Sequence, residues 1–409
     1  MATNDIQTLE EYDLFCDGKL ADPYPFFRRL RSEDPVHRSE RLNSWILTRY
    51  DDVLAASRDR RFSSDRVSVN MSALSEPDQT RFSALGEHVS NWLGFTDPPK
   101  HTRMRGLISG VFTPALAENM RDRTQEIVDE LIDRVERSAR MDLVGDLSYP
   151  LPATVICEIL GVPAGGQRQF KVWADDIAAF VGATGPYAAR AAERAERSRK
   201  ELTGMFRELT LQRRREPRKD LITALAAREG EEAGLTEQEL LGLCVFLFVA
   251  GFETTVSLIS NGMLSLLQHR GELERLRSDP SLMETAVEEF LRYESPIQVD
   301  TRLIAEDLDL RGRSFRKGDA VMMVRAAANR DPAQFPDPDR FDVGRQNNRH
   351  VAFGWGIHFC LGAPLARIEA QIAVKTLLDR LPNLRLESDE LDWWENMTLR
   401  SPRSLPVVF

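Results

Sequence analysis

The sequence predicts a mainly α fold with minor β. Between Asp97 and Gln268, apolar residues recur mostly at spacings of three and four, which is the period of one helix face. After Pro296 the pattern changes to short strand-like runs that cluster together. No repeat, low-complexity tract or long Gly/Ser linker divides the chain, so the sequence marks no clean domain boundary.

The composition is that of an ordinary soluble globular protein. The 409 residues are 29% charged and 42% hydrophobic, which suffices for a large buried core. A formal net charge of −10 argues against a nucleic-acid partner, because such proteins are normally basic. The N-terminus lacks the basic and apolar segments of a signal peptide, and the 13-residue apolar run Leu240–Phe252 is too short to span a bilayer. We therefore expect a cytoplasmic protein that does not contact a membrane.

The N-terminal part alternates short elements. The pattern predicts a helix over Asp22–Glu33, a strand over Ser44–Thr48 and a helix over Tyr50–Ser57. Arg66–Leu93 has no clear period and is predicted as a long loop, a kind of segment that often forms binding loops or lids.

The middle of the chain is predicted as a succession of helices. The predicted helices cover Pro114–Arg137, Leu147–Leu160, Arg168–Phe180, Tyr187–Arg215, Leu235–Leu267 and Pro280–Tyr293. Beyond them the sequence predicts short strands, an irregular Pro/Asp-rich segment, one more helix and strands from Leu384. The strands cover Val299–Ile304, Leu308–Leu310 and Ala320–Val324. The irregular segment covers Asp331–Asp342, and the helix covers Leu361–Leu378.

Four cysteines, Cys16, Cys157, Cys244 and Cys360, are far apart and form no Cys-x-x-Cys pair. This spacing argues against zinc fingers, iron–sulfur clusters and covalent haem attachment. The first three are expected to be small buried apolar residues.

Cys360 stands apart because it lies in the stretch Phe-Gly-Trp-Gly-Ile-His-Phe-Cys-Leu-Gly over residues 353–362. Gly354 and Gly356 predict a turn that delivers the thiol to the start of a helix, where N–H groups and the helix dipole stabilise a thiolate. Gly362 leaves space for a flat ligand. These are the requirements of a thiolate bound to a planar metal cofactor.

This stretch resembles the signature Phe-Gly-x-Gly-x-His-x-Cys-x-Gly of the cytochrome P-450 haem-thiolate monooxygenases. The resemblance covers nearly the whole chain. It implies a cytochrome P-450 fold over residues 1–409, a single large helical domain with a small β-rich region and no fused reductase. It also implies haem b (iron protoporphyrin IX), with Cys360 as the iron ligand and Phe353, Gly354 and Gly362 around the cofactor.

Glu289 and Arg292 form a Glu-x-x-Arg pair on a predicted helix, a spacing that elsewhere in this chain is better explained by surface pairs. In the family such a pair meets an arginine of the irregular segment, which is matched here by Arg340. The resemblance therefore implies a structural network of these three residues that holds the Cys360 loop.

An acid follows the long apolar run in Ala250-Gly251-Phe252-Glu253-Thr254. A carboxyl group there is costly unless it has a partner or a task. From the residues alone, Glu253 could equally touch water at a helix edge, with Thr254 bonded back to the Ala250 carbonyl. The stretch resembles the family's oxygen-activation motif, which implies that Ala250 and Gly251 lie beside the haem, that Thr254 hydrogen-bonds dioxygen or water, and that Glu253 relays protons.

Haem propionates need cationic or N–H partners when they are partly buried. His101 and Arg105 resemble the family's His-x-x-x-Arg propionate site, and Arg302 and His358 match the other two usual positions. Ile304 departs from the alanine that is common two residues after this arginine.

The resemblance implies a monooxygenase that inserts one atom of dioxygen into an apolar organic substrate, by hydroxylation or epoxidation, in secondary metabolism of polyketides or macrolides, terpenoids or fatty acids. Electrons would come from an external ferredoxin or flavodoxin with its reductase, docked near Arg103, Arg349 and Arg367. The expected lining of the substrate pocket is Trp92, Leu93, Phe180, Phe246, Ala250, Ile297, Val299 and Met397.

Three alternatives stay open at this point. A peroxide-driven peroxygenase on the same fold typically lacks an acid–alcohol pair, so Glu253-Thr254 argues against it. A non-catalytic haem sensor would not need the acid. A helical binding module without haem would not need the glycine-rich loop around Cys360.

Overall fold

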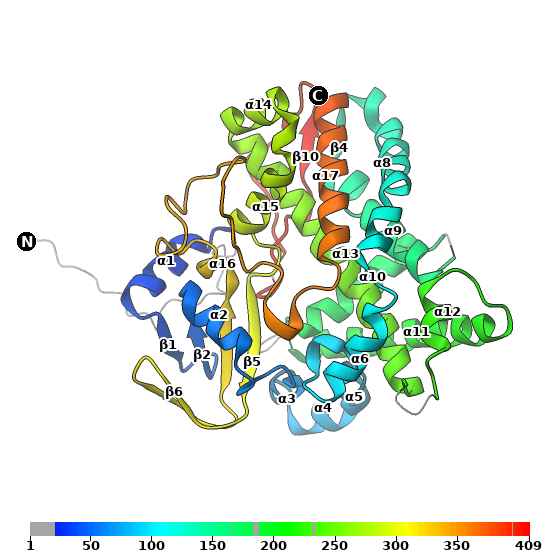
Figure 1. The fold of residues 1–409 in the computed structure, drawn as a ribbon, viewed down its shortest axis with the longest axis vertical. Coiled ribbons are helices and arrows are strands. Elements are labelled where there is room, and N and C mark those ends of the chain that lie inside the picture. The colour runs from blue at the N-terminus through cyan, green and yellow to red at the C-terminus, as the bar shows by residue number, and fades with distance from the viewer. Residues whose placement is uncertain (1–20, 164, 183–187, 231–233, 395) are drawn as a thin grey trace, which may run out of the picture.

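A computed structural model describes residues 21–163, 165–182, 188–230, 234–394 and 396–409 (Figure 1). Helices dominate and the strands form small sheets, as the sequence predicts. Cys16 lies outside the described residues. The first elements are α1 (Tyr24–Glu33), β1 (Val36–Ser39), β2 (Ser44–Leu47), α2 (Tyr50–Arg58), β3 (Phe62–Ser63), α3 (Val67–Ser72), α4 (Glu76–Arg81), α5 (Ser83–Val89) and the 3₁₀ turn η3 (Leu93–Phe95).

The predicted loop over Arg66–Leu93 is wrong, because α3, α4 and α5 occupy most of it. Each of these helices has only six or seven residues, which is too short to show a period in the sequence. A cap marks one of them: Ser75 Oγ accepts a hydrogen bond from the Asp78 N–H at 3.4 Å, and Pro77 stands in the first turn.

The helical middle follows the predicted order with shifted boundaries. It contains α6 (Lys100–Ser109), α7 (Pro114–Asn119), α8 (Arg121–Val135), η4 (Glu136–Ser138), β4 (Arg140–Asp142), the π turn η5 (Val144–Ser148), α9 (Pro150–Leu160), α10 (Gln167–Val181), α11 (Ala188–Arg215), α12 (Leu221–Ala226), α13 (Glu237–Gln268), α14 (Arg270–Ser278), η7 (Pro280–Leu282) and α15 (Met283–Tyr293). The helix predicted over Pro114–Arg137 is two helices that meet at Met120.

The C-terminal part contains β5 (Val299–Ile304), β6 (Leu308–Leu310), β7 (Arg313–Phe315), β8 (Ala320–Val324), α16 (Arg325–Ala328), η8 (Gly356–His358), α17 (Ala363–Arg380), β9 (Arg385–Leu386) and β10 (Pro406–Val408). One sheet has the order β1-β2-β8-β5-β3, with β2 and β8 parallel. A second has the order β4-β10-β9, and β6 and β7 form a hairpin. The five-stranded sheet lies with α1, α2 and α16 beside the helical mass (Figure 1).

The core helix α13 organises the helical mass. Thr236 and Glu239 form a capping box at its start, with hydrogen bonds of 3.2 and 3.0 Å. It packs on α9, α11, α15 and α17. Among the described residues it is the one helix long and apolar enough to cross a membrane, but 78% of its apolar window is buried inside the protein.

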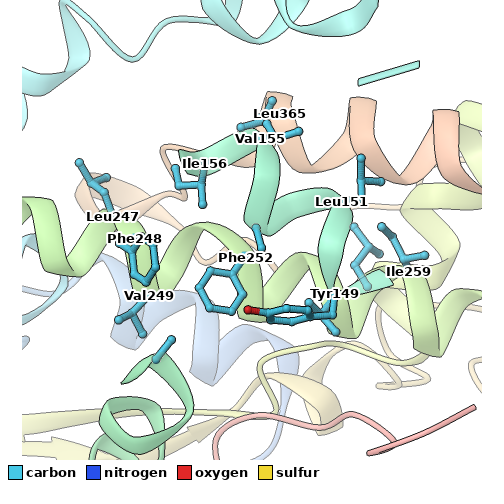
Figure 2. Packing of buried hydrophobic residues seen from close by; sticks show 14 of the residues in the cluster. Tyr149, Leu151, Val155, Ile156, Leu247, Phe248, Val249, Phe252, Ile259 and Leu365 are labelled. Atoms are coloured by element: carbon cyan, nitrogen blue, oxygen red, sulfur yellow. The ribbon is translucent and has the colours of Figure 1, made fainter. Parts of the chain in front are cut away.

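The contact between α13 and α9 explains two residues of the Ala-Gly-Phe-Glu-Thr stretch. Phe252 is completely buried and packs edge-on against Tyr149 and Phe248, each at 5.6 Å between ring centroids (Figure 2). Gly251 faces α9 so closely that a Cβ would lie 2.7 Å from Ile156 Cγ1. Gly251 is therefore needed where the two helices meet, and its predicted place beside the haem stays a prediction.

A buried ion network ties α15 to the irregular segment before the Cys360 loop. Glu289 and Arg292 have no exposed side-chain surface and pair through two hydrogen bonds of 2.7 and 2.8 Å. Arg292 also donates to the carbonyls of Asn329, Pro338 and Arg340 at 3.0, 2.7 and 3.2 Å. This network satisfies the carbonyls of a segment that has no regular structure of its own.

Arg340 does not supply the third charge, so this part of the prediction is wrong. Its side chain is exposed, and only its carbonyl turns inward. Arg345 takes the role instead, with Nε 3.2 Å from Glu289 and further donations to the carbonyls of Pro336, Asp337 and Arg340. Because the segment turns, the arginine five residues later is the one that reaches the buried carboxylate.

Replacing Arg345 by Met should lower the free energy of unfolding by about 1–3 kcal/mol, because Glu289 and three carbonyls lose donors. Arg340→Met is the matched control and should change stability by less than about 0.5 kcal/mol. Chemical denaturation of both variants measures the difference. Equal losses would contradict the assignment of Arg345 to the network.

Candidate active site

The loop that precedes α17 holds Cys360 at the start of that helix. Gly354 and Gly356 have φ of 72° and 70°, in the left-handed region that favours glycine. A Cβ on Gly354 would lie 3.1 Å from Arg325 Nη2, and one on Gly356 would lie 3.0 Å from the Ser57 carbonyl oxygen. The Cys360 N–H donates to the Phe353 carbonyl at 2.9 Å and closes the turn. The physical reasons for the two glycines are thus conformation and close packing.

The electrostatic surroundings of Cys360 differ from those of the other described cysteines. Burial raises the pKa of its thiol, while the Gly362 N–H and nearby guanidinium groups, chiefly Arg325 and Arg105, oppose this shift. Burial raises the pKa of Cys157 and Cys244 to about 12 without any cationic neighbour. These two are inert core residues, as predicted, whereas Cys360 sits among groups that stabilise a thiolate.

One stripe of α13 is accessible although most of the helix is buried. Phe246, Ala250 and Thr254 recur every four residues, so they share one helix face. Ala250 is exposed, and the residues before and after it are half-buried or buried. Thr254 Oγ1 donates to the Ala250 carbonyl at 3.2 Å, which leaves its lone pairs free to accept. This stripe is therefore the accessible part of a helix that is otherwise mostly buried.

Glu253 is half-buried on α13, so the helix-edge interpretation that the sequence left open stays possible for part of the side chain. Its Oε1 is buried and has no hydrogen-bond partner among the described residues. Burial, followed by the negative charge of Asp175, raises the pKa of this carboxyl well above its usual range. This shift favours the neutral, proton-carrying form of Glu253.

The two predicted histidines meet beside the Cys360 loop. The rings of His101, on α6, and His358 lie 4.2 Å apart between centroids. His358 Nε2 lies 3.0 Å from Ser64 Oγ, whereas both ring nitrogens of the buried His101 have no partner among the described residues. Burial lowers the pKa of both rings, so they are neutral. An unpartnered, buried imidazole is suited to donate a hydrogen bond to an anionic ligand.

A buried cationic cluster lies next to these histidines. Arg302 Nη1 and Arg325 Nη2 lie 2.7 and 2.5 Å from the two oxygens of Asp300, and Arg66 Nη2 lies 3.5 Å from one of them. Charge from these arginines holds the pKa of Asp300 far below its usual value, and burial lowers that of Arg66 to about 10. Three guanidinium groups thus surround Asp300, and Asp97 acts on Arg66 as well, which leaves an excess of positive charge that can bind further carboxylates.

Arg302, His101 and His358 were predicted for this place, but Arg66, Asp300 and Arg325 were not. One signal was available: Asp300 and Arg302 are two apart on a strand, so their side chains share a face. Arg325 and Arg66 arrive from other elements, and no spacing in the sequence indicates that. Arg105 donates to the Phe359 carbonyl at 2.7 Å and so also braces the loop.

The structure brings together most of the predicted pocket residues in two groups. Trp92 packs against Phe246 at 5.5 Å between ring centroids. Val299 and Met397 share one buried cluster, and the tail pairs beside β5 through a bridge between Ile297 and Leu399. Leu93 and Phe180 are buried, on η3 and α10, and their place in the pocket stays a prediction.

The predicted basic docking patch needs correction. Arg103 pairs with Glu239 at 2.5 Å and Arg367 pairs with Glu288 at 2.6 Å, so their charges are largely neutralised. Arg349 is exposed. The face beside Cys360 is instead marked by two exposed apolar side chains, Ile357 at 47% and Phe359 at 39%.

The donor set fits a haem. An iron porphyrin with two carboxylates requires a site of this kind. The site offers a thiol at a helix start, two glycine turns, an accessible stripe that includes Thr254, and the unpartnered His101 beside an excess of guanidinium groups. Cys360 would hold the iron, and His101, Arg302 and their neighbours would hold the carboxylates.

Comparison with known proteins agrees with this geometry. The cytochrome P450 family model matches residues 88–390. The chain is 43% identical to cytochrome P450 monooxygenase PikC of Streptomyces venezuelae, over 95% of this chain and 91% of the relative. The structure of P450BioI with an acyl carrier protein that carries hexadec-9Z-enoic acid has a TM-score of 0.88 and 37% identity, over 96% of this chain and 99% of that one. Myxobacterial CYP267B1 with myristic acid has a TM-score of 0.88 and 41% identity, over 97% and 98%. The chain belongs to the cytochrome P450 family and is a haem-thiolate monooxygenase.

Proposed function

We propose that Cys360 is the iron ligand of haem b and that His101, Arg105, Arg302 and His358 secure its propionates. The unpartnered ring of His101 is the observation that carries this assignment, because a buried imidazole without a partner is costly. Arg66 and Arg325 add positive charge from two other elements, and Phe353, Gly354 and Gly362 shape the loop.

When bound, the haem supplies the activation of dioxygen and the transfer of one oxygen atom to the substrate. Thr254 and Glu253 are the residues of this chain proposed to manage protons there. The Thr254 hydroxyl donates its hydrogen bond to the Ala250 carbonyl. Its own oxygen atom therefore accepts a hydrogen bond and positions water or dioxygen. Glu253 carries a proton that it donates toward this hydroxyl.

The proposed substrate is a large apolar compound of polyketide or macrolide type. Relatives named for such compounds, polyketide biosynthesis cytochrome P450 PksS of Bacillus subtilis and 6-deoxyerythronolide B hydroxylase of Saccharopolyspora erythraea, align over 94% and 97% of this chain. The apolar lining from Trp92, Phe246, Val299 and Met397 supports an apolar ligand. Hydroxylation of an unactivated C–H bond is the proposed reaction.

Redox partners donate the electrons, and we propose a ferredoxin or flavodoxin with a separate reductase. The docking face would centre on Ile357 and Phe359, and the exposed Arg349 would contribute a positive charge. A single cytochrome P450 domain over residues 1–409 and a cytoplasmic location complete the proposal.

Cys360→Ala should abolish the red-shifted Soret band of the ferrous–CO complex, because that band needs a thiolate opposite the carbon monoxide. Cys244→Ala is the control, since its thiol is buried in the core, and it should retain the band. Absorption spectra of the two purified variants decide between them. A band that persists without Cys360 would remove this residue as the ligand.

Thr254→Ala should reduce product formed per oxygen consumed by about ten-fold or more and release hydrogen peroxide instead. Ser257→Ala is the matched control, because its hydroxyl bonds back to the Glu253 carbonyl at 3.0 Å on the buried face of the same helix. Peroxide and oxygen assays measure the ratio. Equal ratios in the two variants would contradict a role for the Thr254 hydroxyl.

A spectral binding screen tests the substrate class. We expect 6-deoxyerythronolide B to shift the iron from low to high spin at lower concentration than myristic acid does, because a macrolactone fills more of a pocket lined by aromatic side chains. A shift with myristic acid alone would move the assignment to fatty acids. Both titrations use the same purified holoenzyme.

A further inference from the structure

Arg66 joins the two ends of a long excursion of the chain. This excursion, the 66–95 segment, contains α3, α4, α5 and η3. Arg66 Nη1 donates to the Gly94 carbonyl at 3.1 Å, and the guanidinium carbon lies 4.1 Å from the centroid of the Phe95 ring. Only 14% of the Arg66 side chain is exposed, so water competes little with these contacts. One side chain therefore holds together residues that are 28 positions apart.

The same guanidinium also reaches the five-stranded sheet. Arg66 Nη2 lies 3.5 Å from Asp300, which follows Val299 on β5. At the other end of this bridge, η3 lies against α13, since a Cβ on Gly94 would stand 3.5 Å from the Phe246 ring. Val299 and Phe246 belong to the expected lining of the substrate pocket. Arg66 thus spans two walls of that pocket, one on β5 and one on η3.

The middle of the segment is held less firmly than its ends. Helix α5 buries Leu85 and Val89, but α4 buries no residue. An ion pair of Arg81 and Glu193 at 3.1 Å ties α4 to α11, and the two side chains are 58% and 53% exposed. Such an exposed pair contributes little to stability. Local opening therefore starts in α4, and the buried contacts of Arg66 limit how far it spreads toward η3.

We propose that Arg66 is a positioning residue for the substrate, which clasps the two ends of the 66–95 segment to β5 and so fixes the pocket wall that carries Trp92 and Leu93. A large ligand that touches both walls loses affinity when the clasp is removed, because binding must then order the wall. A small ligand that binds only the iron does not depend on this wall. This inference rests on the substrate pocket and the haem proposed above.

The clasp requires an arginine at position 66. The planar guanidinium stacks on Phe95 while separate N–H groups point to the Gly94 carbonyl and to Asp300, a geometry that the point charge of a lysine does not reproduce. Arg66→Lys therefore keeps the positive charge beside Asp300 but loses the clasp, whereas Arg66→Gln loses both. The two variants separate an effect of charge on cofactor retention from an effect of the clasp on the wall.

Arg81, within the same segment, offers a matched control. Its guanidinium carbon lies 4.8 Å from the centroid of the Phe82 ring, and it pairs with Glu193, so it too combines a stacked ring with a carboxylate. These partners lie beside α5 and on α11, away from the ends of the segment. Arg81→Gln therefore removes the same kinds of contact and the same charge without touching the clasp.

Hydrogen exchange of the holoenzyme without substrate measures the wall directly. The Phe95 N–H donates to the Trp92 carbonyl at 2.9 Å, so its exchange reports on the turn η3. Arg66→Gln and Arg66→Lys should both speed exchange over residues 92–96 by about ten-fold or more, while Arg81→Gln should match the wild type there. Equal rates over these residues in Arg66→Gln and the wild type would overturn the clasp.

Two ligands separate the clasp from general damage to the protein. In spectral titrations normalised to haem content, the dissociation constant of 6-deoxyerythronolide B should rise by about ten-fold in both Arg66 variants, and that of imidazole should change by less than about two-fold. Arg81→Gln should leave both constants unchanged. Equal weakening of both ligands, or wild-type affinity for the macrolactone in Arg66→Lys, would overturn the inference.

The wild type shows whether the proposed function fails instead. If it gave no spin shift with 6-deoxyerythronolide B, the macrolide assignment would fall, and myristic acid would replace the macrolactone in the same comparison. If the wild type gave the shift and Arg66→Gln bound the ligand equally well, the clasp would fall and the proposed function would stand. If neither ligand shifted the iron, hydrogen exchange alone would decide on the clasp.

Discussion

The excess of buried positive charge beside Cys360 is the constraint on which the site depends. Asp300 faces Arg66, Arg302 and Arg325, and His101 has no hydrogen-bond partner among the described residues. Desolvated charge of one sign is unfavourable unless a ligand of the other sign completes it. The fold therefore builds an anion site whose best occupant is a pair of carboxylates, and it does so from the five-stranded sheet, α6 and the Cys360 loop together. A cofactor bound there would link the five-stranded sheet to the helical part of the molecule.

The helix α13 serves two purposes with one sequence. Its buried faces use close contacts, such as Gly251 against Ile156, to fix where the helix lies. Its accessible stripe presents Ala250 and Thr254. Phe252 shows how the two faces are separated, because it is completely buried while Ala250, two residues earlier, is exposed. Rigid packing on one side thus positions chemistry on the other.

Local patterns in the sequence predicted some features well, and long-range geometry set the limits. The ranges of β5, β6 and β8 follow from their short strand-like patterns, and the Cys360 loop follows from its glycines. The exchange of Arg340 for Arg345 could not be predicted, because the direction of an irregular segment depends on the carbonyls it must satisfy. The short helices α3 to α5 were missed because six or seven residues show no period, although Ser75 and Pro77 mark the start of α4.

A crystal structure of the purified holoenzyme tests the central claim most directly. The account predicts electron density that continues from Cys360 Sγ to iron, a porphyrin that faces the accessible stripe of α13, and propionate oxygens within hydrogen-bond distance of His101 and Arg302. A sulfur turned away from iron, or propionates that leave His101 without a partner, would contradict it.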